Sequence, residues 1–567
     1  MKKIYPFLVT ILLFALSIHS VVAQISPVYV GPRGSIHDDP TEGIYVSPDG
    51  NDASATGSIT LPYKSINAAL GKAGAGGTVI LRGGIYREGA AVRIRNSNIT
   101  IKSRKGEWAI IELPIKNPDC GESSTFTFDP EVSHCKLQSV EVIGGFYAVC
   151  LNSKWAWHGP DDEVAASDIL IEDCKLHDSK YEVVKVKPNC NNVTIRYNEI
   201  YNSGRAELGT DNWLNGDAHG EAIDNVNGHN MKVQNNYMHD LNIGLYAKGG
   251  ATDLLIENNL IENVLGAGIQ LGFDTNLEWF DSSANPDYYE NIRGVVCNNL
   301  IINAGWEGIG LYASKDAKVY NNTVVNAVNG RGQYHSALYF GVVPQDGQIG
   351  YGHPANLHSE IHHNIVCQSA TSNKPMIEIR YSLDCGGMSA YSGMPAMHDN
   401  CYYITGKSAK FNDQRPGSKL DNAGFIAWKS HISGDNGSIE ADPAFNANYM
   451  PTNTQCTGMG ISYPLILNPK VGIPMIHDNE NIQVYPNPTK GELRIEIAGQ
   501  ARNDVQSVEI FDIYGRKVYD KFPSNVLEGW QPQADGVVIY LTVLPAGIYF
   551  LKITTEQGGV TKKVVKQ

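Results

Sequence analysis

The sequence predicts an all-β protein in which a parallel β-solenoid is followed by a small β-sandwich. Two observations predict the solenoid: short strands with alternating apolar residues recur through the middle of the chain, and each runs into an asparagine or, once, a cysteine. The equivalent positions are Cys174, Asn198, Asn236, Asn259, Asn299, Asn322 and Asn364.

The spacing of these positions indicates a repeat with insertions. Successive steps are 24, 38, 23, 40, 23 and 42 residues, so the short steps form the unit and the long ones add a loop. A period of about 20–30 residues without helical patterning is typical of a β-solenoid, whose strands stack about 4.8 Å apart. The asparagines then form a ladder at one inner turn, with each amide bonded to its neighbours in the adjacent coils.

The chain begins with a pattern typical of a secretory signal peptide at residues 1–24. Lys2 and Lys3 precede an apolar run at residues 7–16, and Val22 and Ala23 form a small-residue exit. Since no later window approaches 18 uninterrupted apolar residues, we expect no transmembrane segment.

Export makes the ten cysteines possible disulfide formers. Buried free cysteines remain an alternative. The plausible pairs are Cys174 with Cys190, Cys120 with Cys135, and Cys385 with Cys401.

The net charge of −14 and the isoelectric point near 5.6 argue against nucleic acid or an anionic membrane as a partner. An acidic protein that handles a polyanion needs a local basic strip or a bound metal. We expect a monomer.

A short amphipathic helix is predicted near the start of the folded part. Ile66, Ala69 and Leu70 share one face and Ser65 is a possible N-cap, so the helix is suited to cover the open end of the solenoid. The run TVIL from Thr78 is then the first solenoid strand, and coils continue to about residue 403, with looser ones to about 465.

This opening resembles that of secreted bacterial right-handed parallel β-helix proteins, many of which are carbohydrate-active. The crossover rule also favours right-handed winding. We assign residues 25–468 to this domain.

Residues 469–480 are predicted to form a linker. Residues 481–567 contain segments of alternating apolar and polar residues separated by Gly and Pro turns, which predicts a small β-sandwich. Four motifs here closely resemble the C-terminal sorting domain of the type IX secretion system of Bacteroidota. They are Tyr485-Pro486-Asn487-Pro488, Gly515-Arg516, Pro545-Ala546-Gly547-Ile548-Tyr549 and Lys562-Lys563. The resemblance implies that the type IX machinery exports the protein, which is then secreted or attached to the cell surface, with removal of the domain. The alternative is a carbohydrate-binding sandwich.

Function is expected on the outward side chains of the strand that follows the ladder turn, because the inward ones fill the core. One outward column is Lys185, Asp224, Tyr246, Gln270 and Gly310, and the next is Lys187, Val226, Lys248, Gly272 and Tyr312. Glu182 and Glu221 lie one pleat earlier.

Inserted loops bring aromatic residues beside this strip. With Tyr312, the loop residues Trp213 and Trp279 are candidates for stacking on sugar rings. Alternatively, these aromatic residues only pack the loops onto the solenoid.

The acids and lysines of the strip suit β-elimination across a uronic acid. That reaction needs a neutralised substrate carboxylate, a base and a proton donor. Ca²⁺ is the candidate cofactor for the first requirement. The candidate ligands are Glu182, Glu221, Asp224 and Asp217, the candidate bases are Lys248 and Lys187, and the candidate donors are His219 and Tyr246. The resemblance to β-helix polysaccharide lyases of the pectate-lyase and chondroitinase-B types points the same way, at the level of the fold.

The sequence thus favours a secreted lyase of an acidic polysaccharide. A hydrolase of the polygalacturonase type shares the fold and needs paired carboxylates, for which Asp217 and Asp224 are the near pair. A non-catalytic glycan-binding protein or adhesin is the third possibility.

Overall fold

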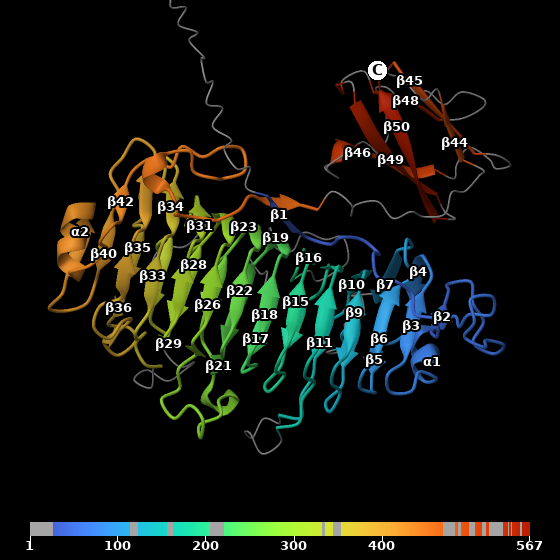
Figure 1. The fold of residues 1–567 in the computed structure, drawn as a ribbon, viewed down its shortest axis with the longest axis horizontal. Helices are drawn as coiled ribbons and strands as arrows, with labels where there is room; N and C mark the ends of the chain where they lie inside the picture. The colour runs from blue at the N-terminus through green and yellow to red at the C-terminus, as the bar shows by residue number, and fades with distance from the viewer. Residues whose placement is uncertain are drawn as a thin grey trace, which may run out of the picture.

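The computed structural model describes residues 26–113, 123–155, 163–204, 220–330, 335–343 and 353–468, together with most strands of residues 482–566. The predicted signal peptide and linker lie outside the described residues. Three long sheets of 12 strands form the body of the molecule (Figure 1). Each coil contributes one strand to sheet 1, then to sheet 2, then to sheet 3, and the strands pair in parallel with those of the next coil. The exception is the last strand of sheet 3, Leu420–Ala423, which pairs antiparallel with Phe411–Asp413. The predicted solenoid is confirmed.

The strands are short because each coil must turn three corners. Sheet 1 contains β2 (Ile44–Val46), β3 (Thr78–Leu81), β6 (Thr100–Ser103), β9 (Lys136–Gln138), β12 (Leu170–Glu172), β15 (Thr194–Arg196), β18 (Lys232–Gln234), β22 (Leu255–Glu257), β26 (Val295–Cys297), β30 (Lys318–Tyr320), β33 (Glu360–His362) and β38 (Ala396–His398). Sheet 2 contains β4 (Gly84–Arg87), β7 (Ala109–Leu113), β10 (Val140–Gly144), β13 (Lys175–His177), β16 (Glu199–Tyr201), β19 (Tyr237–Leu241), β23 (Leu260–Val264), β27 (Leu300–Ala304), β31 (Thr323–Val325), β34 (Ile365–Gln368), β39 (Cys401–Ile404) and β42 (Ile439–Glu440). Sheet 3 contains β5 (Val92–Ile94), β8 (Phe126–Phe128), β11 (Val149–Leu151), β14 (Val184–Val186), β17 (Glu221–Val226), β20 (Ile243–Lys248), β24 (Ile269–Leu271), β28 (Ile309–Tyr312), β32 (Leu338–Gly341), β35 (Ile377–Ile379), β40 (Phe411–Asp413) and β41 (Leu420–Ala423).

Smaller elements decorate the solenoid. A short parallel sheet contains β21 (Ala251–Thr252), β25 (Asn291–Ile292) and β29 (Ser314–Lys315), and an antiparallel hairpin contains β36 (Tyr381–Ser382) and β37 (Met388–Ser389). The described residues include two 3₁₀ helices, η3 (Leu277–Trp279) and η4 (Thr454–Cys456).

The asparagine ladder lies at the corner between sheets 1 and 2, as predicted. From Asn236 onward, each Asn Oδ1 accepts hydrogen bonds from the backbone N and the Nδ2 of the ladder asparagine in the preceding coil, at 2.9–3.1 Å, and Asn198 Oδ1 accepts from Cys174 N at 2.9 Å. All of these side chains are fully buried. The ladder also extends beyond the prediction, to Asn400, whose backbone N donates to Ser438 Oγ at 2.7 Å.

A left-handed residue precedes every step of the ladder and makes the corner sharp. These residues have φ between 52° and 58° and are Asp173, Tyr197, Asn235, Asn258, Asn298, Asn321, His363 and Asp399. Asn, Asp and His tolerate this conformation better than most residues other than glycine.

Helices cover both ends of the solenoid (Figure 1). Helix α1 (Ile66–Leu70) forms as predicted, with Ser65 Oγ accepting from Ala68 N. At the other end, α2 (Phe425–Ile432) buries Trp428 against Phe411, with ring centroids 5.3 Å apart. The apolar end surfaces are therefore shielded from water and from edge pairing.

The start of the solenoid differs from the prediction. Strand β2 pairs with β3 in sheet 1, so Thr78 opens the second strand of that sheet rather than the first. The reason is that α1 and its flanking loops are inserted between two stacked strands.

Segments from both ends of the β-helix domain meet outside sheet 2. Strand β1 (Val28–Val30) pairs in parallel with β43 (Leu465–Leu467), and Val30 and Leu465 pack with Leu260 and Leu300. We call residues 441–468 the strap, because they run back along the outer face of the solenoid (Figure 1).

Two of the three expected cysteine pairs do not form. Cys174 precedes β13 at the ladder corner, whereas Cys190 lies at the corner between sheets 3 and 1, so both are buried apart from each other as free thiols. The sulfur near Cys401 is that of Cys456 in the strap, at 3.5 Å, and not that of Cys385. Cys120 lies outside the described residues.

The C-terminal strands form two antiparallel sheets, as expected for a sandwich. One contains β44 (Ile482–Tyr485), β45 (Glu492–Ile497) and β48 (Val537–Tyr540). The other contains β47 (Lys517–Asp520), β46 (Val505–Asp512), β49 (Gly547–Thr555) and β50 (Gly558–Lys566). Among the described residues, no helix has the length and apolar character needed to cross a membrane.

Replacing Asn259 by Leu tests the ladder. The change leaves the backbone N of Asn236 without its acceptor, removes one of the two acceptors of Asn236 Nδ2, and removes the bond from Asn259 Nδ2 to Val233 O. We expect a loss of about 3 kcal/mol of unfolding free energy, measured by denaturant titration. The exposed Asn448→Leu is the control. Equal stability of the two variants would contradict the ladder as a major source of stability.

Candidate functional site

A cleft of about 500 Å³ lies on the outer face of sheet 3. Its lining includes three lysines and three aromatic residues: Lys185, Lys187, Lys248, Tyr147, Trp155 and Trp279. The structure therefore brings the two predicted bases, Lys187 and Lys248, and the predicted sugar platform Trp279 to one place.

The strands beneath the cleft have the register that the sequence predicted. Lys185 pairs with Asp224 and Asp224 with Tyr246, while Val226 pairs with Lys248. Because outward side chains alternate along each strand, the lysines of β14 and β20 reach the same side of the sheet.

The wall of the cleft is fastened to the solenoid by a buried carboxylate. Glu290 accepts hydrogen bonds from Gly249 N at 2.7 Å, from Thr275 N at 2.9 Å and from Thr275 Oγ1 at 2.8 Å. Gly249 has φ of 69°, which a residue with a Cβ rarely adopts, so the turn after Lys248 depends on glycine. Lys248 is thereby fixed between its strand and a rigid turn.

The two tryptophans connect the loops on either side of the cleft. Trp155 Nε1 donates to Glu278 O at 3.0 Å, and Trp279 O accepts from Asn227 Nδ2 at 3.1 Å. The walls are therefore held in place before any ligand arrives.

Three buried carboxylates lie beneath the lysines. Glu182, Glu221 and Asp224 are 6%, 7% and 0% exposed. Lys185 Nζ binds Asp224 Oδ2 and lies 3.4 Å from Glu182 Oε1. Glu182 Oε2 and Asp224 Oδ1 are buried and receive no hydrogen bond from the described part of the chain. A proton or a cation is thus needed to satisfy these oxygens.

The pKa values of the three groups diverge. Burial raises the pKa of Glu182 to about 7 and that of Glu221 to about 8, and the neighbouring carboxylates add to both shifts. Burial also disfavours ionisation of Asp224, but the charges of Lys185 and Lys248 outweigh it and lower the pKa of that group. Asp224 is therefore the member of the set that is fully ionised at neutral pH.

The three carboxylates do not by themselves form a complete metal-binding site. Among the described residues, two other groups of side chains place three ligand atoms within 4.8 Å of one another, and Glu182, Glu221 and Asp224 do not. A cation held here would use only part of the set and would keep coordination positions open for other ligands.

Two predicted tyrosines are buried beside the cleft. Lys248 Nζ lies 4.3 Å from the ring centroid of Tyr246, and burial raises the pKa of the Tyr246 hydroxyl, which keeps its proton. Tyr312 donates to Glu307 at 2.6 Å and is 4% exposed, so its ring offers little surface for stacking. The predicted residues Trp213, Asp217 and His219 lie outside the described residues.

The sequence prediction missed three contributors to the cleft. Tyr147 and Trp155 come from the preceding coil, and the aromatic insertion near Trp155 was the signal for the second of them. Lys185 was assigned to the outward column without a role, although its neighbour Asp224 indicated the ion pair.

Comparisons with known proteins agree with the fold. The family described as "Right handed beta helix region" matches residues 121–285 and 164–340, and "Secretion system C-terminal sorting domain" matches residues 483–567. The second match indicates that the protein is exported and is secreted or attached to the cell surface.

A curated relative is a pectate lyase of Emericella nidulans, 35% identical over 120 residues. The match covers 19% of this chain, and the chain spans only 29% of that relative. Similar solved structures include pectate lyase Pel9A, with 15% identity, a TM-score of 0.40 and coverage of 58% of this chain and 76% of that one. A mannuronan C-5 epimerase module of Azotobacter vinelandii has 14% identity, a TM-score of 0.40 and coverage of 67% and 94%.

The raised pKa of Glu221 predicts how stability depends on pH. Its ordinary pKa is 4.5 and its folded pKa is about 8, so the folded state holds a proton that the unfolded state has lost between these values. Stability therefore falls as pH rises through this window. In metal-free buffer, we expect the melting temperature of the wild type to drop between about pH 5 and pH 8.5 by several degrees more than that of Glu221→Gln.

The exposed Glu360→Gln is the matched control and should follow the wild type. If Glu221→Gln shows the same pH slope as the wild type, the buried carboxyl does not hold its proton.

Proposed function

We propose that this exported right-handed β-helix protein, which carries a type IX secretion sorting domain, is a polysaccharide lyase that cleaves a uronate-containing glycan by β-elimination. The observation that carries the proposal is the cleft, in which Lys185, Lys187 and Lys248 meet between aromatic walls. The pectate lyase relative supports the reaction class over the short segment that it matches.

The charge of the cleft suits a polyanion. The chain as a whole carries −14, so an acidic glycan is repelled from most of its surface. The cleft lining contains three lysines and one acidic residue, Asp274, and Lys187 and Lys248 remain to attract a carboxylate while Lys185 pairs with Asp224. The indole and phenol rings of Trp155, Trp279 and Tyr147 offer apolar faces to the sugar rings.

The lysines also supply the chemistry of elimination. The reaction removes the proton on the carbon next to the carboxylate, moves its electron pair into a new C=C bond, and expels the glycosidic oxygen. We assign the base to Lys248, since it lines the cleft and comes from β20, the strand that pairs with the strand of Asp224. Lys187 binds the substrate carboxylate, on which negative charge grows in the transition state, while Lys185 holds Asp224 in place. Tyr246 and His219 are the candidate donors to the leaving oxygen.

Alanine variants of the two lysines test this assignment. We expect Lys248→Ala to lose turnover by about 1,000-fold with an unchanged melting temperature, because general-base catalysis is lost and the fold is not. Lys187→Ala should mainly raise KM. The assay is the ultraviolet absorbance of the unsaturated uronide, screened on pectin, alginate, ulvan and glycosaminoglycans.

The exposed Lys232→Ala is the control for charge removal. Loss of turnover in Lys187→Ala alone would move the base to the preceding coil. Normal turnover in both variants would exclude lysine catalysis in this cleft.

Calcium is the proposed cofactor. Glu182 and Asp224 fit it, because their two unsatisfied buried oxygens are the hard donors that Ca²⁺ prefers, and Asp224 is ionised. When bound, Ca²⁺ would neutralise the carboxylate of the substrate and acidify the neighbouring C–H bond. Glu221 would lie on the protein side of the bound ion, and the lysines would act on the substrate as described above.

Calcium should stabilise the folded protein. We expect Ca²⁺ to raise the melting temperature, more at about pH 8 than at about pH 5, because Glu182 and Glu221 lose their protons in this range. Asp224→Asn should abolish the shift, whereas Glu360→Gln should retain it. A shift that persists in Asp224→Asn would place calcium elsewhere.

Glycoside hydrolysis is the second candidate, favoured by one observation. A protonated carboxyl beside an ionised one, here Glu221 beside Asp224, is the combination that hydrolases use as acid and base. New reducing ends without ultraviolet absorbance would support it. Binding of a glycan without either product would indicate an adhesin.

A further inference from the structure

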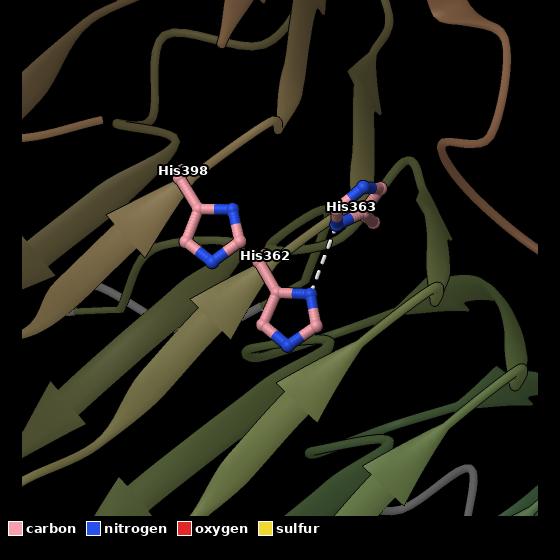
Figure 2. Close-up of side chains that lie close together, drawn as sticks. All are labelled: His362, His363 and His398. Atoms are coloured by element: carbon pink, nitrogen blue, oxygen red, sulfur yellow. Dashed lines mark hydrogen bonds between the residues drawn. The ribbon is translucent and has the colours of Figure 1, made fainter. Parts of the chain in front are cut away.

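Three histidines gather at the ladder corner far from the cleft, where strands β33 and β38 end (Figure 2). They are His362, His363 and His398, and one ring nitrogen from each lies within 4.8 Å of the others. None of them contributes to the lining of the cleft.

Two of the rings are aligned by the register of the solenoid. His362 and His398 are paired residues of adjacent coils, and their rings stack with centroids 4.7 Å apart and planes 2° apart. Their nitrogens therefore face the same way, as Figure 2 shows.

The third ring turns toward them because of the corner. His363 is the left-handed residue of its coil, with φ of 56°, and its ring stands at 87° to that of His362. The Nδ1 atoms of His362 and His363 share a hydrogen bond of 2.9 Å, whose proton a bound ion would replace (Figure 2). Two nitrogens at this separation can share one ion at about 2.1 Å from each.

The fold does not require histidine at these positions. Four earlier coils place asparagine at the left-handed position of His363, namely Asn235, Asn258, Asn298 and Asn321. The strand-end position of His362 and His398 is occupied elsewhere by Arg196, Gln234, Glu257, Cys297 and Tyr320. Three imidazoles in two successive coils are therefore not explained by the corner itself.

A comparable group at the other end of the ladder has its charges compensated. His37, Glu172 and Asp173 also place ligand atoms within 4.8 Å, but Arg33 binds Asp173 at 2.7 and 2.8 Å and Arg196 binds Glu172 at 2.7 Å. Guanidinium groups occupy the place that a cation would take there.

We propose that His362, His363 and His398 bind a divalent transition metal of the zinc class at this corner. Three imidazoles are the donor set that Zn²⁺ prefers, and they do not suit the Ca²⁺ proposed for the cleft. Small ring rotations bring the third nitrogen into range, since His363 and His398 are 36% and 47% exposed. That exposure also gives the ion an entry path.

A carboxylate completes the set. Asp399 is the left-handed residue one coil after His363, and its Oδ2 lies 2.8 Å from His398 Nδ1 and 4.0 Å from His363 Nε2. It supplies the fourth ligand or orients His398, as carboxylates do beside metal-bound histidines.

The metal would join two coils at the place where the strap crosses them. Gly460 N, in the strap, donates to His363 O at 2.7 Å, and Asn321 Nδ2 donates to Gly458 O at 2.8 Å. Fixing His363 therefore also fixes the anchoring of the strap that leads to the C-terminal domain.

Zinc titration of the untagged, chelator-treated protein tests the proposal, because a polyhistidine tag would bind the same ion. We expect one Zn²⁺ per chain by calorimetry and a higher melting temperature in its presence. His363→Asn should weaken binding by about 100-fold or more and keep the fold, because asparagine already occupies this position in other coils.

The control is His358→Asn, which removes an exposed histidine of the same coil, also with positive φ. This variant should bind Zn²⁺ like the wild type. Equal affinity in His363→Asn, or no saturable binding by the wild type, would overturn the proposal. The response to Ca²⁺ should be unchanged in His363→Asn, which separates this site from the cleft.

Discussion

The buried asparagine ladder is the interaction on which the rest of the structure depends. Each amide accepts two hydrogen bonds from the coil before it and occupies a corner where the backbone would otherwise leave polar groups unpaired in the core. Because a shift by one residue would move every amide out of line, the ladder fixes the stacking register of successive coils. The outward side chains and the loops are therefore positioned by the same register.

The cleft is the main consequence. Sequence-distant residues such as Lys185, Asp224 and Tyr246 become direct neighbours because three coils are held in step. The charges of Lys185 and Lys248 then lower the pKa of Asp224, whereas burial raises that of Glu221, and the lysines line the cleft above them. A scaffold that is rigid through hydrogen bonds can hold this unfavourable concentration of charge without collapsing around it.

Much of the fold and of the strand register could be predicted, because each coil of a solenoid mainly contacts the coils next to it in the sequence. The steps of 23 and 24 residues sufficed to align β14, β17 and β20 correctly, and Ser65 with three apolar residues identified the capping helix. The sequence does not show what depends on distances between side chains. Lys185 could not be distinguished from a solvated surface lysine, and Trp155 could not be placed against Glu278 across the cleft. The histidine corner escaped notice because His398 is 36 residues from His362, outside the regular step. Removal of the C-terminal domain after export stays a prediction.

The pairing of β1 with β43 has a consequence for the order of folding. Solenoid coils form between near neighbours in sequence and can grow one upon another, but this pair joins segments from opposite ends of the β-helix domain. Val30 therefore cannot be buried against Leu465 until the last coil and the strap have been synthesised. This contact forms only when the whole β-helix domain is present. A truncated chain can stack coils, but it leaves the apolar flank of sheet 2 exposed to proteases and to other chains.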